Sequence, residues 1–306
     1  MQSKYIWMNG KLMNGAEVQM PFLTPAVHYG MAVFEGIRCY RAVNGSAIFR
    51  LREHMERLLK SATVMGWREL PFTAGQLIEA CVETVRANGH EECYIRPLIY
   101  LGAGGWNLNL DGGQAQVGIA VWQWNAYLGP EATEHGVRAN VSSYTRHHPN
   151  VSLTKSKVAG NYPNSVLAKT ESVRLGFDEA IMLDTQGMVA ECTGENIFLI
   201  RDGKLLTPPD AQILEGITRD TVMILAREMG MEVIAQPISR DQLYTADEVF
   251  VTGTAAEVVG LREIDFRTIG NGRTGPITRK LQQAYHASVR GELPQSAKWL
   301  TYVPSK

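Results

Sequence analysis

The chain has 306 residues, of which 45% are hydrophobic and 20% are charged. This balance supplies apolar side chains for packed cores and excludes a disordered chain, and the length favours roughly two domains. Lysine and arginine number 30 against 31 aspartate and glutamate residues, which gives a net charge of −1. Such a chain lacks the basic surface of a nucleic-acid-binding protein, and we therefore expect small-molecule chemistry.

No apolar run comes near the roughly 20 residues that span a bilayer, and residues 1–7 lack the apolar segment of a secretory signal. We therefore expect a cytoplasmic protein with no membrane partner. The four cysteines form no Cys-x-x-Cys pair, which favours buried thiols over a disulfide. No metal is expected at His147 and His148, because no acidic, histidine or cysteine partner stands at a ligand spacing.

Turn dipeptides and helical periodicity organise the first 124 residues. Three Asn-Gly pairs follow strand-like runs and indicate antiparallel hairpins. They are Asn9-Gly10, Asn14-Gly15 and Asn44-Gly45. Apolar residues at helical spacing predict helices near 51–62 and 77–85, and strands are expected at 93–101 and 117–124.

The polar segment 125–136 is the predicted linker between a domain of residues 1–124 and a domain of residues 137–306. In the second domain, strands are expected at 137–144 and 248–252, and helices within 162–175, at 218–229 and around 277–285. Hairpins are expected between 180 and 191 and across Asp202-Gly203. Because strands and helices are interspersed while many strands are joined by hairpins, we predict an α+β fold class with two domains.

One glycine-rich segment matches the Gly-x-Gly-x-x-Gly pattern of dinucleotide-binding proteins, namely Gly270-Asn271-Gly272-Arg273-Thr274-Gly275. That pattern needs a following strand with an acidic residue about 20 positions on, and a polar segment with Pro294 stands there instead. A turn before a helix opened by Pro276 explains the same residues. We therefore predict a turn, and a nicotinamide-dependent dehydrogenase is the least favoured function.

Several residues suit cofactor chemistry but have an ordinary explanation when taken singly. Lys157 lies among small residues that would let a planar group approach the backbone, yet an isolated lysine is usually solvated. Gly216-Ile217-Thr218 begins a predicted helix whose first N–H groups suit an anion, but simple capping explains them too. The residues alone therefore indicate an α+β protein and leave an enzymatic role open.

Seven motifs stand in order along the chain: His28-Tyr29-Gly30, Val33-Phe34-Glu35-Gly36-Ile37-Arg38, Tyr94-Ile95-Arg96-Pro97, Lys157 to Tyr162, Glu191-Cys192-Thr193-Gly194-Glu195-Asn196, Gly216-Ile217-Thr218-Arg219 and Gly253-Thr254-Ala255-Ala256-Glu257. Together they resemble the branched-chain amino acid aminotransferases, which are pyridoxal-phosphate enzymes of the class IV aminotransferase fold. The resemblance covers nearly the whole chain. It implies a small N-terminal α/β domain, a larger C-terminal β-barrel-like domain with flanking helices, and a homo-oligomer.

By this resemblance the cofactor is pyridoxal 5′-phosphate, and Lys157, rather than Lys155, is the residue whose amine bonds the cofactor aldehyde. The same amine would move the proton at the substrate α-carbon, for which it must be deprotonated. Glu191, rather than Glu195, matches the carboxylate that keeps the pyridine nitrogen protonated. Arg57 matches the arginine on the cofactor phosphate. The other implied cofactor contacts are Tyr162, Leu214, Gly216, Ile217, Thr218, Gly253 and Thr254.

The resemblance also implies the substrate side of the site. Tyr94 and the Thr254-Ala255 backbone would receive the α-carboxylate, and Arg96 would hold the distal carboxylate of glutamate. A buried carboxylate without a partner is costly, so this arginine lets an apolar pocket accept glutamate as well. The other implied pocket residues are Tyr29, Phe34, Gly36, Trp124, Tyr127 and Tyr162. Trp106 lies in the loop 104–113, which is expected to reach the partner subunit's site.

The predicted function is a reversible transfer of the amino group between L-leucine, L-isoleucine or L-valine and 2-oxoglutarate with ping-pong kinetics. The small-molecule partners are thus branched-chain L-amino acids, L-glutamate and their 2-oxo acids. A D-amino acid transaminase and an aminodeoxychorismate lyase of the same fold are the nearest alternatives. A non-enzymatic protein that binds pyridoxal phosphate is the alternative from a different class.

Overall fold

The computed structural model describes residues 3–104, 108, 110, 113–124, 128–129 and 131–304, and the chain divides into two compact units. Unit 1 comprises Met1–Trp124, Lys155–Asn161 and Ala287–Lys306. Unit 2 comprises Asn125–Thr154 and Tyr162–His286. The sequence places all of 137–306 in the second domain, whereas in the structure two short segments of that range cluster with unit 1.

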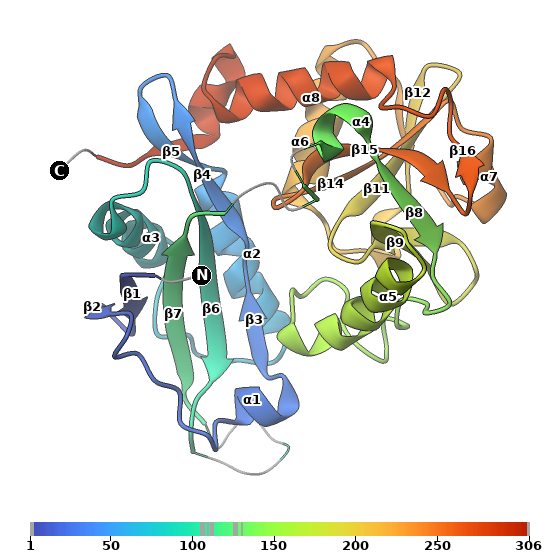
Figure 1. Cartoon of the computed structure of the whole chain (residues 1–306). Coiled ribbons are helices and arrows are strands. Elements are labelled where there is room, and N and C mark those ends of the chain that lie inside the picture. Colours follow the sequence, from blue (N-terminus) through green and yellow to red (C-terminus); the bar gives the residue numbers. More distant parts are fainter. Residues whose placement is uncertain are drawn as a thin grey trace. The chain divides into compact units, whose positions relative to one another are not determined.

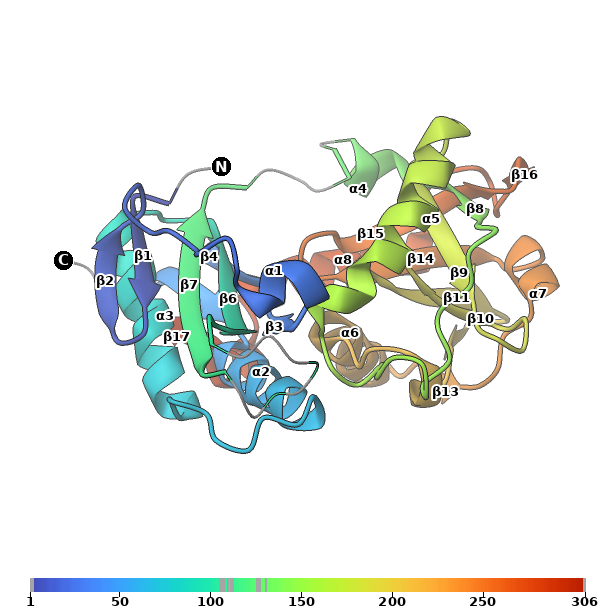
Figure 2. The same ribbon diagram turned by 90° about the horizontal axis from the view of Figure 1, so that it is seen from below.

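Unit 1 is built on an antiparallel sheet against which two helices, α2 and α3, pack (Figure 1). The strand order is β17-β5-β4-β6-β7-β1-β2, with β3 paired to β6, and Figure 2 shows β2, β1 and β7 side by side. The strands are β1 (Tyr5–Met8), β2 (Lys11–Asn14), β3 (Ala32–Phe34), β4 (Ile37–Ala42), β5 (Gly45–Phe49), β6 (Cys93–Leu101), β7 (Ala115–Trp122) and β17 (Leu300–Tyr302). The helices are α1 (Pro25–Tyr29), α2 (Leu51–Val64) and α3 (Ala74–Asn88), with the 3₁₀ turns η2 (Ala159–Asn161) and η4 (Pro294–Lys298).

Local sequence signals fix the ends of these elements. The turn between β1 and β2 has Asn9 and Gly10 at φ angles of 47° and 97°, as a two-residue hairpin requires. Helix α3 begins with a capping box formed by Thr73 and Gln76 and ends at Gly89, whose φ is 71°. The hairpin at Asn44-Gly45 is likewise confirmed, because β4 pairs with β5 across it.

The hairpin predicted at Asn14-Gly15 is wrong. The N–H of Gly15 donates to the carbonyl oxygen of Lys4 at 2.8 Å, so the turn closes against the start of β1. The described residues 15–24 that follow contain turns and no strand. At this position the Asn-Gly turn ends strand β2 and does not join it to a second strand of a hairpin.

The two later segments return to unit 1 through specific backbone pairing. Strand β17 adds to β5, with Thr301 opposite Ile48. In the other segment, the N–H of Gly160 donates to the carbonyl oxygen of Gly30 at 3.2 Å. A Cβ on Gly30 would lie 2.7 Å from the Cα of Gly160, and the φ of Gly30 is +66°, so glycine is needed for this approach.

The core of unit 1 lies between the sheet and the helices. Leu51, Met55 and Leu58 form the apolar stripe of α2 and are fully buried in one cluster with Ile37 and Ile95. Complete burial of each such side chain stabilises the fold by ~1.5–3 kcal/mol relative to exposure. The helix predicted from this spacing is therefore confirmed.

Unit 2 is built on a mixed sheet in the order β10-β9-β8-β15-β14-β11-β12-β13, with β16 paired to β15. Strand β8 runs parallel to β9 and β15, and β12 runs parallel to β13. The strands are β8 (Val137–Val141), β9 (Glu179–Leu183), β10 (Val189–Cys192), β11 (Asn196–Arg201), β12 (Lys204–Thr207), β13 (Val233–Ala235), β14 (Glu248–Gly253), β15 (Glu257–Ile264) and β16 (Arg267–Thr268). The helices are α4 (Ala132–His135), α5 (Tyr162–Arg174), α6 (Ile217–Glu228), α7 (Arg240–Tyr244) and α8 (Pro276–Val289), with the 3₁₀ turn η3 (Asp210–Gln212). Helix α8 continues beyond His286 into unit 1.

The glycine-rich segment 270–275 is a turn, as predicted. Gly272 has a φ of 78°, and its N–H donates to the carbonyl oxygen of Ile269 at 2.9 Å. The carboxylate of Glu248 accepts from the N–H groups of Ile277 and Thr278 at 2.9 and 2.7 Å. The N-terminus of α8 is thus occupied by a carboxylate of the chain itself.

All four cysteines are free and buried, which confirms the prediction of buried thiols. Burial raises the pKa of the Cys81 thiol above its ordinary value, as expected for a thiol that is neither a nucleophile nor a ligand. Within the part of the chain that the structure describes, no helix combines the length and the apolar character needed to cross a bilayer. The antiparallel sheet of unit 1, the mixed sheet of unit 2 and the flanking helices confirm the predicted α+β class.

Candidate active site

Hydrogen bonds to its backbone hold Lys157 in place. Its N–H donates to the Oγ of Ser61 at 3.1 Å, and its carbonyl oxygen accepts from the N–H of Phe34 at 3.1 Å. The Oγ of the preceding Ser156 donates to the carbonyl oxygen of Ser61 at 2.9 Å. These bonds fix the Cα of Lys157 between α2 and β3, and its Nζ lies 5.2 Å from the centroid of the Phe34 ring.

Arg96 of β6 lies among aromatic rings. Its Cζ is 4.6 Å from the ring centroid of Phe34, 5.5 Å from that of Tyr94 and 5.8 Å from that of Trp122. Distances within ~6 Å permit cation–π attraction. The Nε of Arg96 is buried and finds no hydrogen-bond acceptor among the described residues. A buried, unsatisfied donor beside apolar rings suits the carboxylate of an otherwise apolar ligand.

Gly36 and Tyr94 lie directly against each other. A Cβ on Gly36 would lie 1.9 Å from the Oη of Tyr94 and 2.8 Å from its Cζ. The Tyr94 ring packs in turn on Trp124 at a centroid distance of 4.4 Å and on Trp122 at 5.2 Å. The predicted residues that unit 1 brings together are thus Lys157, Phe34, Gly36, Tyr94, Arg96 and Trp124.

Arg57 projects from α2 onto a buried carboxylate. Its Nε donates to the Oε1 of Glu35 at 2.6 Å, and its Nη2 donates to the Oε2 at 2.8 Å. The Nδ1 of His54 lies 2.7 Å from the same Oε2. Burial by itself would raise the pKa of Glu35, but the charge of Arg57 and the hydrogen bonds from both partners hold this pKa well below its usual range. Burial lowers the pKa of His54, so its ring is neutral near pH 7.

Glu191, in β10, is a second anchored carboxylate, and it belongs to unit 2. Its Oε1 lies 2.8 Å from the Nη2 of Arg146. Its Oε2 accepts from the N–H of Leu214 at 3.3 Å and from the Nδ2 of Asn196 at 3.4 Å. Glu195 instead accepts from the N–H of its neighbour Gly194 at 3.1 Å. Several donors from different elements therefore fix the orientation of the Glu191 carboxylate.

The segment after Leu214 leads into the N-terminus of α6. This helix begins at Ile217 with Gly216 as its N-cap. A Cβ on Gly216 would lie 2.0 Å from the Oδ1 of Asn196, so Asn196 connects the helix start with Glu191. The first N–H groups of a helix carry partial positive charge and favour an anion. Thr218 follows in the same first turn and is buried.

Strand β14 ends at Gly253, from which the chain turns through Thr254 and Ala255. A Cβ on Gly253 would lie 3.2 Å from the Cγ of Glu195. The strand also pairs with β11, where Thr252 lies opposite Asn196. Unit 2 therefore gathers the predicted residues around Glu191, the start of α6 and the end of β14.

The other predicted residues are Tyr162, Tyr29, Tyr127 and Trp106. Tyr162 begins α5 and lines a cavity of about 430 Å³ with Lys169 and Thr193. Tyr29 ends α1 and is 43% exposed. Tyr127 and Trp106 lie outside the described residues, so their roles stay predictions.

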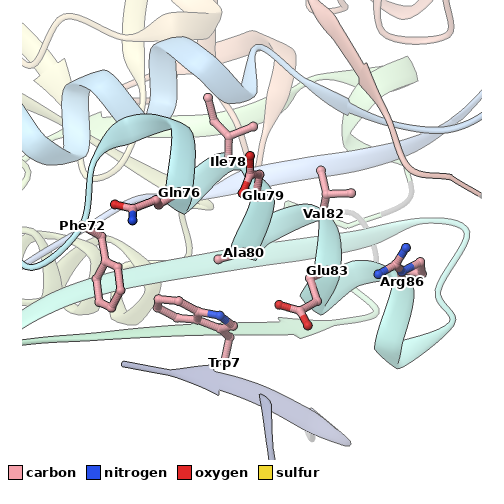
Figure 3. Close-up of a pocket in the computed structure, with 9 residues that line it drawn as sticks. All are labelled: Trp7, Phe72, Gln76, Ile78, Glu79, Ala80, Val82, Glu83 and Arg86. Atoms are coloured by element: carbon pink, nitrogen blue, oxygen red, sulfur yellow. The ribbon is translucent and has the colours of Figure 1, made fainter. Parts of the chain in front are cut away.

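A further cavity of unit 1, of about 510 Å³, lies along α3 (Figure 3). Trp7 and Phe72 meet edge to face there at a centroid distance of 4.9 Å, and Glu79, Glu83 and Arg86 line it as well. None of the predicted site residues lines this cavity. The predicted site residues therefore lie outside this cavity.

The sequence assigned no role to the residues that orient these groups, namely Glu35, His54, Ser61, Arg146 and Asn196, although Glu35 and Asn196 stand within two of the seven motifs. Two of them carry a local signal. Glu35 is a carboxylate within a strand-like apolar run, where burial demands a cationic partner. His54 precedes Arg57 by one helical turn and so shares its face. No local pattern joins Arg146 to Glu191, because only the fold brings them together.

Comparison with known proteins shows the family of the chain. Residues 32–264 match the family model described as amino-transferase class IV. The chain is 47% identical over 298 residues to the branched-chain-amino-acid aminotransferase of Pseudomonas aeruginosa, and the match covers 97% of each chain.

Solved structures give the same result. The crystal structure of the Escherichia coli branched-chain amino acid aminotransferase is similar, with a TM-score of 0.97, 43% identity and coverage of 99% of this chain and 100% of the other. A T.th. branched-chain amino acid aminotransferase with pyridoxamine 5′-phosphate gives a TM-score of 0.96 at 48% identity, with coverage of 99% and 100%. The T.th. enzyme complexed with N-(5′-phosphopyridoxyl)-L-glutamate gives a TM-score of 0.94 at 46% identity, with the same coverage.

The chain therefore belongs to the class IV aminotransferases, and its α+β fold is that of this family. Within that class, the relatives that match over nearly their whole length are named branched-chain-amino-acid aminotransferases. The resemblance inferred from the seven motifs is thus confirmed.

Proposed function

We propose that this chain is a branched-chain-amino-acid aminotransferase, which transfers an amino group reversibly between L-leucine, L-isoleucine or L-valine and 2-oxoglutarate. The family and the full-length relatives support an enzyme of this type. The observation that carries the proposal is Arg96, whose buried Nε has no acceptor among the described residues and whose guanidinium lies against the rings of Phe34 and Tyr94. One surface thus offers apolar contact to a branched side chain and a charge to the distal carboxylate of glutamate.

The cofactor of this chain is pyridoxal 5′-phosphate, as the ligands of its structural relatives imply. When bound, it supplies an aldehyde that takes up the amino group and a ring that accepts electrons. The donor set of the chain fits this group, because it offers an amine, an arginine and an anchored carboxylate. Lys157 would bond the aldehyde, Arg57 with the N–H groups of Ile217 and Thr218 would hold the phosphate, and Glu191 would face the pyridine nitrogen. The other proposed contacts are Tyr162, Leu214, Gly216, Gly253 and Thr254.

Lys157 has two tasks in this mechanism. Its amine would tether the cofactor between turnovers, and as a free amine it would accept the proton of the substrate α-carbon. Both tasks need a fixed backbone and a movable side chain. The hydrogen bonds from Lys157 to Ser61 and from Phe34 to Lys157 support this role, since they hold the Cα while the Nζ changes position.

Glu191 would hold a proton on the ring nitrogen of the cofactor. Its carboxylate is well suited to this task because Arg146, Asn196 and the N–H of Leu214 hold it in one orientation. By holding this proton, Glu191 would ease the loss of the proton from the substrate α-carbon.

On the substrate side, the hydroxyl of Tyr94 and the backbone of Thr254 and Ala255 would receive the α-carboxylate, and Arg96 would receive the distal carboxylate of glutamate. The apolar side chains of the substrates would contact the remaining pocket residues. These are Tyr29, Phe34, Gly36, Trp124, Tyr127 and Tyr162. Since one methylene changes discrimination by only ~1–3 kcal/mol, leucine, isoleucine and valine should all react.

We also infer a homo-oligomer located in the cytoplasm. Phe22, Leu23 and Val27 on and before α1 are 80%, 56% and 58% exposed, which supports a subunit contact near Tyr29. Four free thiols are consistent with a reducing compartment. Sedimentation velocity tests the first inference and cell fractionation tests the second.

Half-reactions followed by the cofactor absorbance test the proposed function. L-leucine and L-glutamate should each convert the holoenzyme. Arg96→Met should slow the reaction with glutamate ~30-fold or more, because loss of a buried charge partner costs ~2–5 kcal/mol, and should leave leucine nearly unaffected. Faster conversion by D-alanine than by L-leucine would assign the D-amino acid alternative, and conversion of aminodeoxychorismate alone would assign the lyase. An unchanged spectrum with every compound would indicate a binding protein without activity.

A further inference from the structure

A buried cluster formed by Glu35, His54 and Arg57 lies beside the residues assigned to catalysis. The side chains of Glu35 and His54 are 0% and 2% exposed, and that of Arg57 is 14% exposed. Glu35 lies between β3 and β4, and its N–H donates to the carbonyl oxygen of Pro97 at 3.0 Å. A carboxylate at this depth requires compensating charge and hydrogen bonds, and the cluster supplies both.

Glu35 holds Arg57 by two bonds at once. The Nε and the Nη2 of Arg57 donate to separate oxygens of the carboxylate, at 2.6 and 2.8 Å. Such a paired contact fixes the plane of the guanidinium as well as its position. Because His54 is neutral, it donates a hydrogen bond to Glu35 at 2.7 Å without adding a second positive charge.

Helix α2 connects this cluster with Lys157. Arg57 and Ser61 stand four residues apart and therefore share one face of the helix, and His54 lies on that face one turn earlier. Ser61 accepts from the N–H of Lys157 at 3.1 Å and from the Oγ of Ser156 at 2.9 Å. One helix thus carries both the arginine and the anchor of the lysine.

We propose that Glu35 is a positioning residue, which fixes the guanidinium of Arg57 so that the cofactor phosphate is held in register with Lys157, and that His54 supports Glu35. This inference rests on the proposed function, since it concerns the phosphate of pyridoxal 5′-phosphate. The paired contact with the carboxylate reduces the number of rotamers open to Arg57, so less side-chain freedom is lost when the phosphate binds. Glu35 touches no reacting atom, so its effect passes through Arg57.

The binding of two ligands distinguishes a positioning role of Glu35 from a general structural role. Pyridoxal 5′-phosphate and pyridoxal differ only in the phosphate group. The full chain, from which cofactor has been removed, is titrated with each of them. Binding is measured from the change in ligand absorbance. Glu35→Gln should lower the affinity for pyridoxal 5′-phosphate by ~10-fold or more, as expected when an arginine loses its preorganising partner, and leave the affinity for pyridoxal within about twofold. In an Arg57→Ala background, Glu35→Gln should cause no further loss, because the two residues act as one unit.

Glu248→Gln is the matched control. Glu248 is also a buried carboxylate, but it accepts hydrogen bonds from backbone N–H groups of α8. Among the described residues, no arginine forms an ion pair with it. This variant should bind both ligands as the unaltered chain does. His54→Gln should show a smaller loss than Glu35→Gln, again confined to the phosphorylated ligand.

Three results would overturn the inference. They are an unchanged affinity of Glu35→Gln for pyridoxal 5′-phosphate, an equal loss for both ligands, and an undiminished effect of Glu35→Gln in the Arg57→Ala background. If Glu35→Gln does not fold, Glu35→Asp replaces it, since the shorter carboxylate keeps the charge but loses the paired contact. Failure of the unaltered chain to bind pyridoxal 5′-phosphate would instead refute the proposed function.

Discussion

Substitution of Gly36 by alanine tests the placement of Tyr94 directly. The added Cβ would lie 1.9 Å from the Oη of Tyr94, whereas ordinary contact begins at 3.4 Å, so the tip of the ring must move by about 1.5 Å. The ring has little room to do so, because it packs on Trp124 at 4.4 Å and on Trp122 at 5.2 Å. The displacement therefore moves the hydroxyl that is proposed to receive the substrate carboxylate.

The expected loss is larger for catalysis than for stability. Overpacking of this kind costs ~1–3 kcal/mol of folding free energy, while a displacement of ~1 Å in a positioning group lowers the rate ~10²-fold. For Gly36→Ala we therefore expect kcat/KM with L-leucine to fall ~10²-fold. The absorbance of the bound cofactor should be unchanged, because Lys157 is anchored separately through Ser61 and Phe34.

Gly75→Ala is the matched control for this prediction. Gly75 is exposed in the first turn of α3, and the nearest atom to an added Cβ is the Oγ of Thr73 at 3.9 Å. This substitution should leave kcat/KM unchanged and preserve or slightly raise stability. If Gly36→Ala keeps kcat/KM within about twofold of the unaltered enzyme, Tyr94 does not stand where the structure places it and the reasoning is refuted.

Three further predictions concern other parts of the chain. Glu191→Gln should retain the cofactor and slow turnover by ~10²–10³-fold, measured in single turnovers, and an unchanged rate would exclude its electrostatic role. Burial and the charge of Arg146 lower the pKa of His147 from 6.5 to about 4, so its contribution to stability is complete above pH 6.5 and is lost as the pH falls toward 4. Denaturant unfolding at pH 7 and pH 4 should therefore show a smaller acid loss for His147→Gln than for the unaltered chain, and equal losses would contradict this. Gly30→Ala should displace the Lys157 segment, since its Cβ would lie 2.7 Å from the Cα of Gly160, and a variant of full activity would show that this approach is dispensable.

Elements with strong local signals were predictable from the sequence. Helix α2 spans Leu51–Val64 and α3 spans Ala74–Asn88, around the apolar stripes that indicate them. The hairpin across Asp202-Gly203 forms because both residues adopt positive φ, at 51° and 73°. The Asn14-Gly15 turn has the same chemistry, yet its outcome depends on the contact of Gly15 with Lys4, which the dipeptide does not encode.

The proposed catalytic residues were predicted only from an ordered set of motifs. The residues that contact them in the structure were not predicted. Lys157 belongs with unit 1 because Ser61 and β3 hold its backbone, although it follows the predicted linker in sequence. Arg146 reaches Glu191 because its N–H donates to the carbonyl oxygen of Leu183 in β9, the strand that pairs with β10. Such partners come from distant parts of the chain, so hydrophobic periodicity and turn chemistry contain no information about them.

The amine of Lys157 is the proposed tether of the cofactor, and chemical trapping tests this role most directly. Borohydride reduction of the holoenzyme, followed by peptide mapping, should place a phosphopyridoxyl group on Lys157. Lys155→Ala should be labelled to the same extent, and Lys157→Ala should carry no label. A label on Lys155 or any other lysine, or none in a chain that binds the cofactor, would contradict the account.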